Sequence, residues 1–488
     1  MKKFFLFSLI ILVIACQENP EKKPQMSEEK LYRPAFHFTP KKSWMNDPNG
    51  MFYYKGTYHL YFQYYPDDNV WGPMHWGHAT SKDMVHWEEH PIALYPDEMG
   101  YIFSGSAVVD HKNTSGFGQD GKTPIVAIFT HHNMEKEKAA QVDVETQSIA
   151  YSLDEGMTWT KYADNPVIEN PEIRDFRDPK VIWDDNSNQW IMALAAHDNV
   201  RFYASPNLKD WSYLSNFGLN LGHHGGVWEC PDLFPLKVAG SDEIMWVLFV
   251  SINPGGPNGG SATQYFVGDF DGTNFILDQD FAKGLKNRND FWVDFGRDNY
   301  AGVTWQNIQR DNGNRLFIGW MSNWDYAQEV PTFTWRSAMT IAREIGLIKT
   351  TEGYRLIAVP VEEAISTLEP LTHNSKELLG SMKLELAFET KKKVGYVLSN
   401  DLGEKLEFGF DPAKQHFYID RTKAGKNDFS EKFAPQLSYA PRFAKEKSIH
   451  GTMILDKTSI ELFWDNGQTV MTEVFFPSAP FNQITQIE

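Results

Sequence analysis

The chain has 488 residues, more than a single hydrophobic core usually supports, so at least two domains are expected. Its formal net charge of −18 repels nucleic acid and acidic polymers, which excludes nucleic acid as a partner and favours a neutral substrate. The 16 Trp, 20 Tyr and 34 Phe favour β-strands and can stack on the apolar faces of sugars, although core packing accounts for most individual rings.

The first residues have the pattern of an export signal. Lys2 and Lys3 precede an apolar stretch over residues 4–15, which is too short to span a bilayer as a helix of the mature protein. The small or apolar residues directly before Cys16 resemble a bacterial lipobox, in which cleavage leaves that cysteine as the lipidated first residue. We therefore predict a signal peptide over residues 1–15 and a bacterial cell-envelope protein held at the membrane by a lipid on Cys16; a plain secretory signal is the alternative. Lipidation leaves Cys230 alone, so no intramolecular disulfide is expected.

Residues 16–31 are predicted to be a flexible tether, because they are rich in Glu, Lys, Pro and Gln and hold few large apolar residues. From residue 32 to about residue 345, short β-like runs alternate with clusters of Gly, Pro, Asn and Asp; examples are 51–54, 58–62, 125–129 and 245–250. This region is predicted to be an all-β domain.

A weak repeat within this region suggests how its strands are arranged. Segments 81–87, 152–159 and 205–211 each begin with Ser in a polar turn, end with Trp, and lie between two strand-like runs. Recurrence at intervals of about 50 to 70 residues is what a hairpin in successive propeller blades produces. On this pattern alone, a sandwich or a solenoid stays open.

The last part of the chain is predicted to be a second domain. Pro360 is followed by helix formers, which predicts a short helix within a linker over residues 346–375. Period-two alternation at 382–388 and 458–463 is typical of half-exposed antiparallel sheets. Residues 376–488 are therefore predicted to form a β-sandwich.

Three carboxylates in predicted turns or loops stand out before residue 345. Asp47 lies in the run WMNDPNG at 44–50, Asp178 lies between Arg and Pro, and Glu229 lies between Trp and Cys. Taken singly, each is most simply a capped turn or a surface ion pair. Taken together, they supply what retaining glycoside hydrolysis needs, an ionised carboxylate as nucleophile and a protonated carboxyl as acid. Propeller blades can bring such residues together at the central axis.

The surroundings of these residues suggest a role for each. A turn that holds Asp47 on backbone amides keeps it ionised to attack the sugar carbon. Glu229, flanked by Trp228 and the thiol of Cys230, is expected to have its pKa raised by desolvation, as a general acid requires. Asp178 is expected to accept hydrogen bonds from sugar hydroxyls that strengthen in the transition state.

From about residue 33 onward the chain resembles glycoside hydrolase family 32, the fructan hydrolases and invertases. The resemblance rests on several independent motifs: WMNDPNG at 44–50, FQYYP at 62–66, HWGHA at 75–79, FSGS at 103–106, FRDP at 176–179, WECP at 228–231 and GWMSNWDY at 319–326. It implies a five-bladed β-propeller with a central funnel over residues 32–345, followed by a C-terminal β-sandwich.

The family pattern, carried onto this sequence, implies that Asp47 is the nucleophile, Glu229 the general acid/base and Asp178 the transition-state stabiliser. It also implies that seven further residues surround the terminal fructosyl unit: Asn46, Gln63, Trp71, Phe103, Ser104, Arg177 and Trp324. Without the family pattern, the three aromatic residues read as core, the glutamine as a sheet hydrogen bonder, and the arginine as a partner that neutralises Asp178.

The leading hypothesis is an exo-acting β-fructosidase that releases fructose from the ends of fructans, levan or inulin, with sucrose as a secondary substrate. The Gly-rich segment at 253–266 supports this hypothesis because it resembles exo-acting inulinases and levanases. His75 and His78 lack a third ligand at a useful spacing, so no metal or other cofactor is predicted. The alternatives are a non-catalytic fructan-binding surface lipoprotein and a fructosyltransferase of the same fold.

Overall fold

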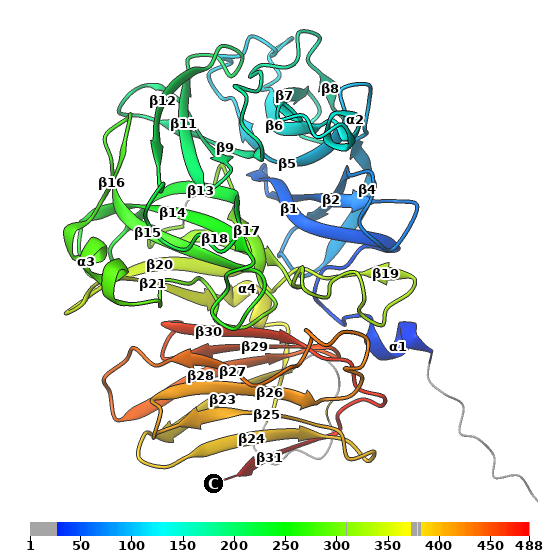
Figure 1. Ribbon diagram of the computed structural model, residues 1–488, viewed down its shortest axis with the longest axis vertical. Coiled ribbons are helices and arrows are strands. Elements are labelled where there is room, and N and C mark those ends of the chain that lie inside the picture. The colour runs from blue at the N-terminus through cyan, green and yellow to red at the C-terminus, as the bar shows by residue number, and fades with distance from the viewer. Residues whose placement is uncertain (1–26, 309, 372–377, 379–381, 488) are drawn as a thin grey trace, which may run out of the picture.

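The computed structural model describes residues 27–308, 310–371, 378 and 382–487 (Figure 1). The predicted signal peptide and Cys16 lie outside the described residues. Within the described part, no helix is long and apolar enough to cross a membrane. The described chain is mostly β-strand, and its helices are short: α1 (Glu28–Tyr32), α2 (Met134–Lys138), α3 (Gln279–Asn287) and α4 (Glu362–Ile365).

Residues 43–360 form five sheets, each built mainly from consecutive antiparallel strands. The first sheet contains β1 (Ser43–Tyr54), β2 (Thr57–Tyr65), β3 (His75–Ser81), β4 (Trp87–Leu94) and β19 (Trp335–Arg336). The second contains β5 (Tyr101–Val109), β6 (Ile125–His132), β7 (Glu145–Ser152) and β8 (Thr160–Lys161). The third contains β9 (Phe176–Asp184), β10 (Gln189–Ala196), β11 (Asn199–Ser205) and β12 (Ser212–Phe217). The fourth contains β13 (Val227–Lys237), β14 (Ile244–Asn253), β15 (Ala262–Phe270) and β16 (Phe275–Leu277), and the fifth β17 (Tyr300–Thr304), β18 (Arg315–Trp320), β20 (Arg343–Thr350) and β21 (Gly353–Pro360).

The first strands of the five sheets contact one another in a closed ring. In chain order β1 contacts β5, β5 contacts β9, β9 contacts β13 and β13 contacts β17, and β17 returns to β1. The short strand β19 pairs in parallel with the start of β1 and so joins the end of this region to its beginning. The upper part of Figure 1 shows these sheets arranged around a common axis.

Each of the five first strands is interrupted by a shift in register. The shifts lie between Met45 and Pro48 in β1, Ile102 and Gly105 in β5, Arg177 and Lys180 in β9, Glu229 and Asp232 in β13, and Tyr300 and Val303 in β17. Such bulges re-aim side chains that a regular strand would point to alternate faces.

The three candidate carboxylates lie in these bulged strands, so their prediction as turn or loop residues was wrong. β1, β9 and β13 continue through Asp47, Asp178 and Glu229. The residues that resembled turn signals instead mark the bulges, where Asp178 has a φ of 65° and Cys230 a φ of 46°. A bulge and a turn use the same backbone conformations, and the sequence alone does not separate them.

The repeated Ser-to-Trp segments connect the third and outer strands of three sheets, β3 to β4, β7 to β8 and β11 to β12. The hydroxyl of Ser81 accepts the N–H of Met84 at 2.8 Å, and Trp87 Nε1 donates to the Met84 carbonyl at 3.1 Å. Trp211 repeats the second bond with the Leu208 carbonyl at 3.0 Å. The prediction of hairpins at these positions is confirmed.

Two expected boundaries differ in the structure. Residues 346–360, expected as linker, lie in β20 and β21, where alternate side chains such as Leu347 and Leu356 are buried in the fifth sheet. The predicted short helix follows Pro360 as α4. At the other end, residues 28–31 of the expected tether form most of α1, because Leu31 and Tyr32 are buried there.

Two further sheets form the C-terminal part, below the five sheets in Figure 1. One contains β22 (Glu369–Pro370), β23 (Met382–Glu389), β28 (Ser448–Leu455), β29 (Ser459–Trp464) and β30 (Thr469–Val474). The other contains β24 (Val394–Ser399), β25 (Lys405–Asp411), β26 (His416–Lys423), β27 (Ser438–Pro441) and β31 (Gln483–Ile487). Trp464 of the first sheet stacks on Phe417 of the second, with ring centroids 4.6 Å apart, so the sheets pack face to face.

Buried charges join the two parts of the molecule. Arg343 of β20 is fully buried and donates to Asp294 at 2.8 Å and to Glu461 of β29 at 2.6 Å. His37 lies 2.9 Å from Asp456 and 2.8 Å from Glu461. Burial opposes the charge on His37, but the two carboxylates raise its pKa to about 9, so the imidazole is cationic at neutral pH. Separating the two parts would leave these buried charges without partners, which is energetically costly. The ion pairs therefore hold the two parts together.

Candidate active site

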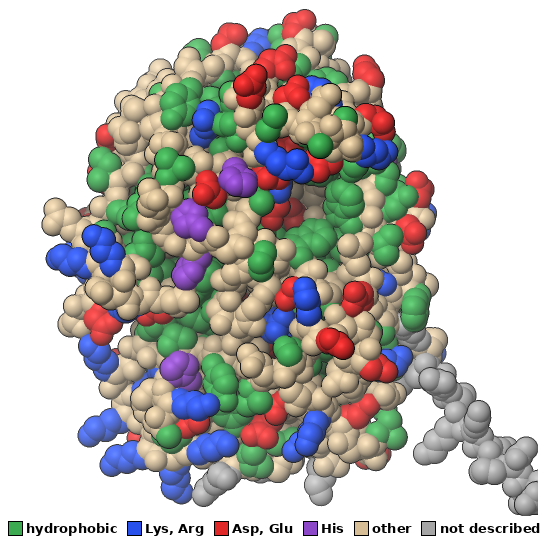
Figure 2. All heavy atoms as spheres, viewed as in Figure 1, with side chains coloured by type: hydrophobic (Ala, Val, Ile, Leu, Met, Phe, Trp, Pro, Cys, Tyr) green, Lys and Arg blue, Asp and Glu red, His purple; other side chains and the backbone are tan. Residues whose placement is uncertain are grey.

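A cavity of about 460 Å³ opens at the end of the ring where β5, β9 and β13 begin. Figure 2 shows a hollow in the upper half of this face, with acidic side chains inside it. All ten residues predicted for the site line the cavity: Asn46, Asp47, Gln63, Trp71, Phe103, Ser104, Arg177, Asp178, Glu229 and Trp324. The structure therefore brings together residues that are up to 278 positions apart, from Asn46 to Trp324.

Asp47 is held by side chains from its own strand and from β5. Trp44 Nε1 donates to Asn46 Oδ1 at 2.7 Å, and Asn46 Nδ2 donates to Asp47 Oδ1 at 3.0 Å. Ser104 Oγ donates to the other oxygen, Oδ2, at 2.7 Å. Asn49 joins the strands, because its Oδ1 accepts the N–H of Gly105 at 3.0 Å. These bonds fix both oxygens of the Asp47 carboxylate.

Asp178 and Asp47 face the same small space across the thiol of Cys230. The Cys230 sulfur lies 3.5 Å from Asp47 Oδ2 and 3.7 Å from Asp178 Oδ2. The backbone N–H of Cys230 also donates to Asp178 Oδ2 at 2.9 Å. Burial, together with the two aspartates, raises the pKa of Cys230 well above its usual value, so the thiol stays protonated and can donate. The bulge in β13 thus positions two carboxylates of other strands.

Arg177 connects Glu229 to a wider acidic network. Its guanidinium donates to Glu229 at 3.1 Å, to Glu145 at 3.1 Å and to Asp175 at 2.7 Å. The hydroxyl of Tyr300, on the bulge of β17, donates to the second oxygen of Glu229. Although burial opposes it, these carboxylates raise the pKa of Arg177 well above its usual value. Its main partners are therefore residues other than the adjacent aspartate of the same motif.

The clustered carboxylates make ionisation of the site costly. Burial raises the pKa of Asp47, and the charge of Glu229 adds to the rise, while hydrogen bonds from Ser104 and Asn46 oppose it. Burial likewise raises the pKa of Asp178 to about 8, with Glu229 and Asp47 adding and Arg177 opposing. At neutral pH Asp178 therefore retains a proton that an isolated carboxyl would release.

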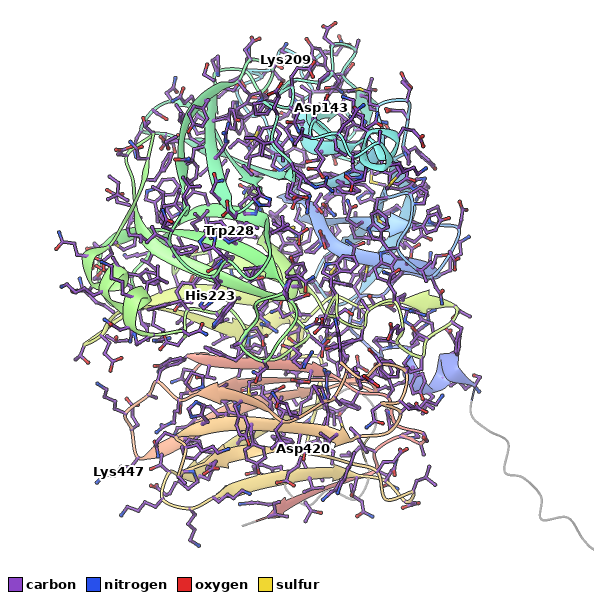
Figure 3. All side chains as sticks on the ribbon, in the orientation of Figure 1. Asp143, Lys209, His223, Trp228, Asp420 and Lys447 are labelled. Carbon is purple, nitrogen blue, oxygen red and sulfur yellow. The ribbon has the colours of Figure 1, made fainter. Side chains whose placement is uncertain are left out.

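Trp228 does not flank Glu229 as expected. Its ring is fully buried, packs on Phe266 and donates from Nε1 to the His223 carbonyl at 2.8 Å (Figure 3). Neighbouring residues of a strand point to opposite faces, so Trp228 enters the core where Glu229 enters the cavity. The other expected neighbour, Cys230, lies in the bulge with its thiol against the carboxylates of Asp47 and Asp178.

Three aromatic side chains form the walls of the cavity and are only partly buried. Phe103 stacks on His132 with ring centroids 4.2 Å apart, and Trp71 meets Phe103 edge-on at 6.2 Å. Trp324 stacks on Trp44 at 5.8 Å. Each ring therefore has a packed side and an open side, which differs from the core interpretation.

Gln63 is buried at the cavity with a free donor. Its side chain is 2% exposed, and its Nε2 has no hydrogen-bond partner among the described residues. A buried amide without a partner is costly unless a ligand satisfies it.

Sequence reasoning missed several lining residues: His132, Met134, Glu137, Asp175 and Gln328. Asp175 could have been predicted from the sequence. It lies two residues before Arg177, and side chains two residues apart in an extended chain point to the same side. The others come from β6, α2 and the segment before β19, whose approach to the cavity depends on the tertiary fold.

His75 and His78 lie outside the cavity lining. His78 Nε2 is 3.1 Å from His59 Nδ1, and its ring stacks on Tyr61 with centroids 4.3 Å apart. Within the described residues, no group of three or more His, Cys, Asp or Glu side chains is arranged to hold a metal ion. That the site works without a metal stays a prediction.

Two family models cover almost the whole described chain. Residues 37–360 match the glycosyl hydrolases family 32 N-terminal domain, and residues 357–488 match the glycosyl hydrolases family 32 C terminal. The two models overlap at residues 357–360, the end of β21, which is the last strand of the five sheets.

Relatives of established activity agree with this match. The chain is 46% identical over 464 residues to a levanase of Bacillus subtilis, covering 91% of this chain and 66% of the levanase. It is 41% identical over 491 residues to the extracellular exo-inulinase of Aspergillus niger, covering 92% of this chain and 90% of the relative. The crystal structure of exo-inulinase from Aspergillus awamori superimposes with a TM-score of 0.86 at 38% identity, covering 95% and 96% of the two chains. Sequence, fold and site geometry together show that the chain belongs to glycosyl hydrolase family 32.

Proposed function

We propose that this chain is a retaining β-fructosidase that releases terminal fructosyl units from fructans and also cleaves sucrose. One observation carries the proposal: Asp47, Asp178 and Glu229, from three different strands, meet in one open cavity. The relatives named levanase and exo-inulinase support fructans as the substrate class.

We infer that the five sheets are the blades of a five-bladed β-propeller and that the final two sheets form the β-sandwich. Support comes from the closed ring of β1, β5, β9, β13 and β17, which are the inner strands on this interpretation. The catalytic domain then runs to Pro360, the end of β21, and the linker is confined to the segment that contains α4.

In the proposed reaction Asp47 attacks C2 of the fructosyl unit while the bond from C2 to the leaving oxygen breaks. Glu229 gives its proton to that oxygen, and a covalent fructosyl ester forms on Asp47. Water then attacks C2, Glu229 takes a proton from the water, and Asp47 leaves as a carboxylate. Two displacements at the same carbon give net retention.

The surrounding residues orient the two reacting groups. Ser104 and Asn46 hold the Asp47 oxygens, so little reorganisation accompanies the attack. Arg177 and Tyr300 hold Glu229 from two sides. Burial is the main cause of the raised pKa of Asp47, and the charge of Glu229 adds to it. When Glu229 carries the proton that it gives to the leaving oxygen, this repulsion is removed and the pKa of Asp47 falls.

The sugar is proposed to bind through hydroxyl contacts and ring packing. Asp178 accepts hydrogen bonds from sugar hydroxyls, and the free Nε2 of Gln63 donates one. The open sides of Trp71, Phe103 and Trp324 pack against the apolar edges of the fructosyl ring and its neighbour.

Exo action is supported by the closed floor of the cavity. Further along the axis, Lys180 and Asp232 are buried with their charged atoms 3.2 Å apart, and Lys180 also donates to the Thr304 carbonyl at 2.6 Å. A polymer therefore cannot pass through the ring, which favours entry of a chain end.

Export to the outside of the cytoplasmic membrane is part of the proposal, supported by relatives described as extracellular. The lipid anchor on Cys16 is a separate prediction. Substituting Cys16→Ser should move the protein from the membrane fraction to the soluble fraction, and an unchanged distribution would contradict the anchor.

The proposed function is tested by initial rates and product analysis on inulin, levan and sucrose. Free fructose should be the first product from both polymers, and sucrose should be split. Early release of oligosaccharides would contradict exo action. Binding without turnover would instead support the non-catalytic alternative, and transfer of fructose to sugar acceptors over water would support the transferase.

A further inference from the structure

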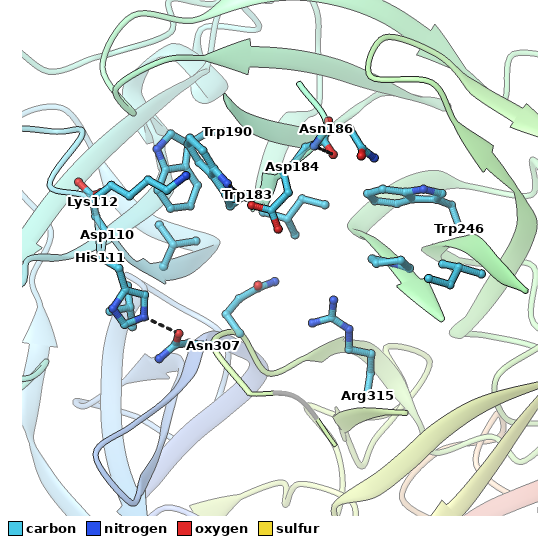
Figure 4. Close-up of a pocket in the computed structure, with 17 residues that line it drawn as sticks. Asp110, His111, Lys112, Trp183, Asp184, Asn186, Trp190, Trp246, Asn307 and Arg315 are labelled. Atoms are coloured by element: carbon cyan, nitrogen blue, oxygen red, sulfur yellow. Dashed lines mark hydrogen bonds between the residues drawn. The ribbon is translucent and has the colours of Figure 1, made fainter. Parts of the chain in front are cut away.

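A second cavity, of about 560 Å³, lies at the opposite end of the same strands (Figure 4). In β9, Asp178 lines the first cavity and Asp184 lines the second; in β13, Glu229 and Pro235 do the same. Six residues of strand separate each pair, which corresponds to about 20 Å. The buried Lys180–Asp232 pair lies between them along the axis, so the two cavities are separate.

Tryptophan side chains form much of the wall of this second cavity. Figure 4 shows Trp183 and Trp190 on one side of an open space and Trp246 on the other. Trp183 is only partly buried and meets Trp190 edge-on with centroids 5.0 Å apart. Lys112 lies 4.2 Å over the Trp183 ring and fixes one of its faces. Paired aromatic walls of this kind suit a ligand with apolar ring faces.

Two donors in this cavity have no partner within the described part of the chain. Gln306 is 8% exposed, and its Nε2 makes no hydrogen bond. Arg315, at the start of β18, extends toward the open space in Figure 4 and forms neither a hydrogen bond nor an ion pair with a described residue. Burial lowers the pKa of Arg315, while the charge of Asp232 opposes the change. Because Gln306 is buried, leaving its donor unpaired is costly, whereas Arg315 is half-buried and presents its guanidinium at the cavity. A ligand that accepts hydrogen bonds would pair with both.

The chemistry of the lining selects among ligand classes. An apolar ligand would leave Gln306 and Arg315 unpaired. An anion would meet the carboxylates of Asp184 and Asp185 in a chain of net charge −18. A neutral polyhydroxylated ring satisfies donors and acceptors together and packs its apolar faces on tryptophan.

We propose that this cavity is a second carbohydrate-binding site, which holds a fructosyl oligosaccharide segment on the face of the molecule opposite the catalytic cavity. The identity of the sugar rests on the proposed function; the presence of a sugar site does not. Because no chain can thread between the cavities, the segment bound here belongs to another polymer chain or to a distant part of the same one. The site therefore keeps the enzyme on polymeric substrate between cleavages.

Binding is measured by calorimetry with a short inulin-type oligosaccharide, on the full chain carrying Asp47→Asn so that the ligand survives. Two sites are expected. Adding Arg315→Gln or, separately, Trp183→Ala should remove one of them, and Tyr213→Ala serves as the matched control. Tyr213 is 51% exposed on β12, the outer strand of the sheet that holds Trp183, and its removal should leave both sites.

Kinetics supply an independent readout in the chain with native Asp47. Arg315→Gln and Trp183→Ala should each raise KM for inulin or levan several-fold and leave kcat and KM for sucrose within twofold of native. A single binding site that neither substitution affects, or equal KM values for polymer, would overturn the proposal. A native chain that splits no sucrose would overturn the proposed function instead, and the calorimetric result would still decide on the second site.

Discussion

The first strands of the five sheets differ between their two ends. At the first end every strand is bulged, and the bulges turn Asp47, Asp178 and Glu229 into one cavity. At the second end β5, β9 and β13 pair regularly with their neighbours, and the cavity there is lined by tryptophans, by carboxylates and by two donors without partners among the described residues. The comparison shows that shifts in strand register bring together the charged side chains that we propose for catalysis. Where the same strands pair regularly, they form a wall that can bind a ligand.

The largest effect expected at the bulged end comes from Asp47→Asn. The amide keeps the shape and the contacts to Ser104 and Asn46 but cannot form the fructosyl ester, so kcat on sucrose should fall on the order of 10⁴-fold or more. The melting temperature should stay near native, which separates lost chemistry from lost folding. Retention of even a tenth of native turnover would show that Asp47 is not the nucleophile.

Glu229→Gln should reduce turnover by about 10² to 10⁴-fold, because the leaving oxygen loses its proton donor. An activated fructosyl donor, whose leaving group needs no proton, should restore the first step. Azide should then speed breakdown of the ester and give a fructosyl azide of retained configuration. Azide without effect on the rate would place the acid/base role on another residue.

Ser104→Ala should lower kcat/KM by about tenfold, through loss of a charge-assisted hydrogen bond to Asp47. That bond holds down the pKa of Asp47, so its removal raises this pKa further and moves the acid limb of the pH–kcat/KM profile to higher pH. Ser106→Ala is the control, because Ser106 on the same strand donates to the Pro179 carbonyl and not to a carboxylate. Equal acid limbs for the two variants would contradict the assigned contact.

The smallest effect expected is a gain in stability from Asp178→Asn. The native pKa of Asp178 is about 8 against 3.8 for an isolated aspartate, so between these pH values the unfolded chain releases a proton that the native chain retains. This group therefore lowers stability progressively as pH rises from about 4 to about 8. The asparagine side chain does not titrate. The melting temperature of the variant should therefore match that of the native protein at pH 4 and exceed it by several degrees at pH 8. A variant less stable than native at pH 8 would contradict the assigned electrostatic cost.

The sequence was sufficient to predict ten of the residues that line the first cavity. Motifs such as FRDP and WECP contain residues that act as a unit, so resemblance to the family located all ten lining residues that were proposed. The short Ser-to-Trp hairpins could also be predicted from the sequence, because their serine and tryptophan form hydrogen bonds within the same turn.

The errors came from features that depend on pairing between strands. Bulges around Asp47 and Asp178 resembled turns, since only the partner strand reveals a shift in register. The hydrogen bonds of Arg177 with Glu145 and Glu229 join β9 to β7 and β13. No local sequence pattern predicts contacts between these strands. The second cavity was not predicted at all, because Trp183 and Trp246 belong to different sheets and face one cavity only in the tertiary fold.

The central claim is that Asp47 carries the fructosyl group, and trapping that ester tests it most directly. Glu229→Gln is incubated briefly with an activated fructosyl donor, quenched in acid, digested and analysed by mass spectrometry; without its general base the ester should accumulate. The account predicts one added fructosyl unit on the peptide that contains Asp47, and none when Asp47→Asn is also present. A fructosyl unit on a peptide containing Asp178, or none under conditions of measurable turnover, would contradict it.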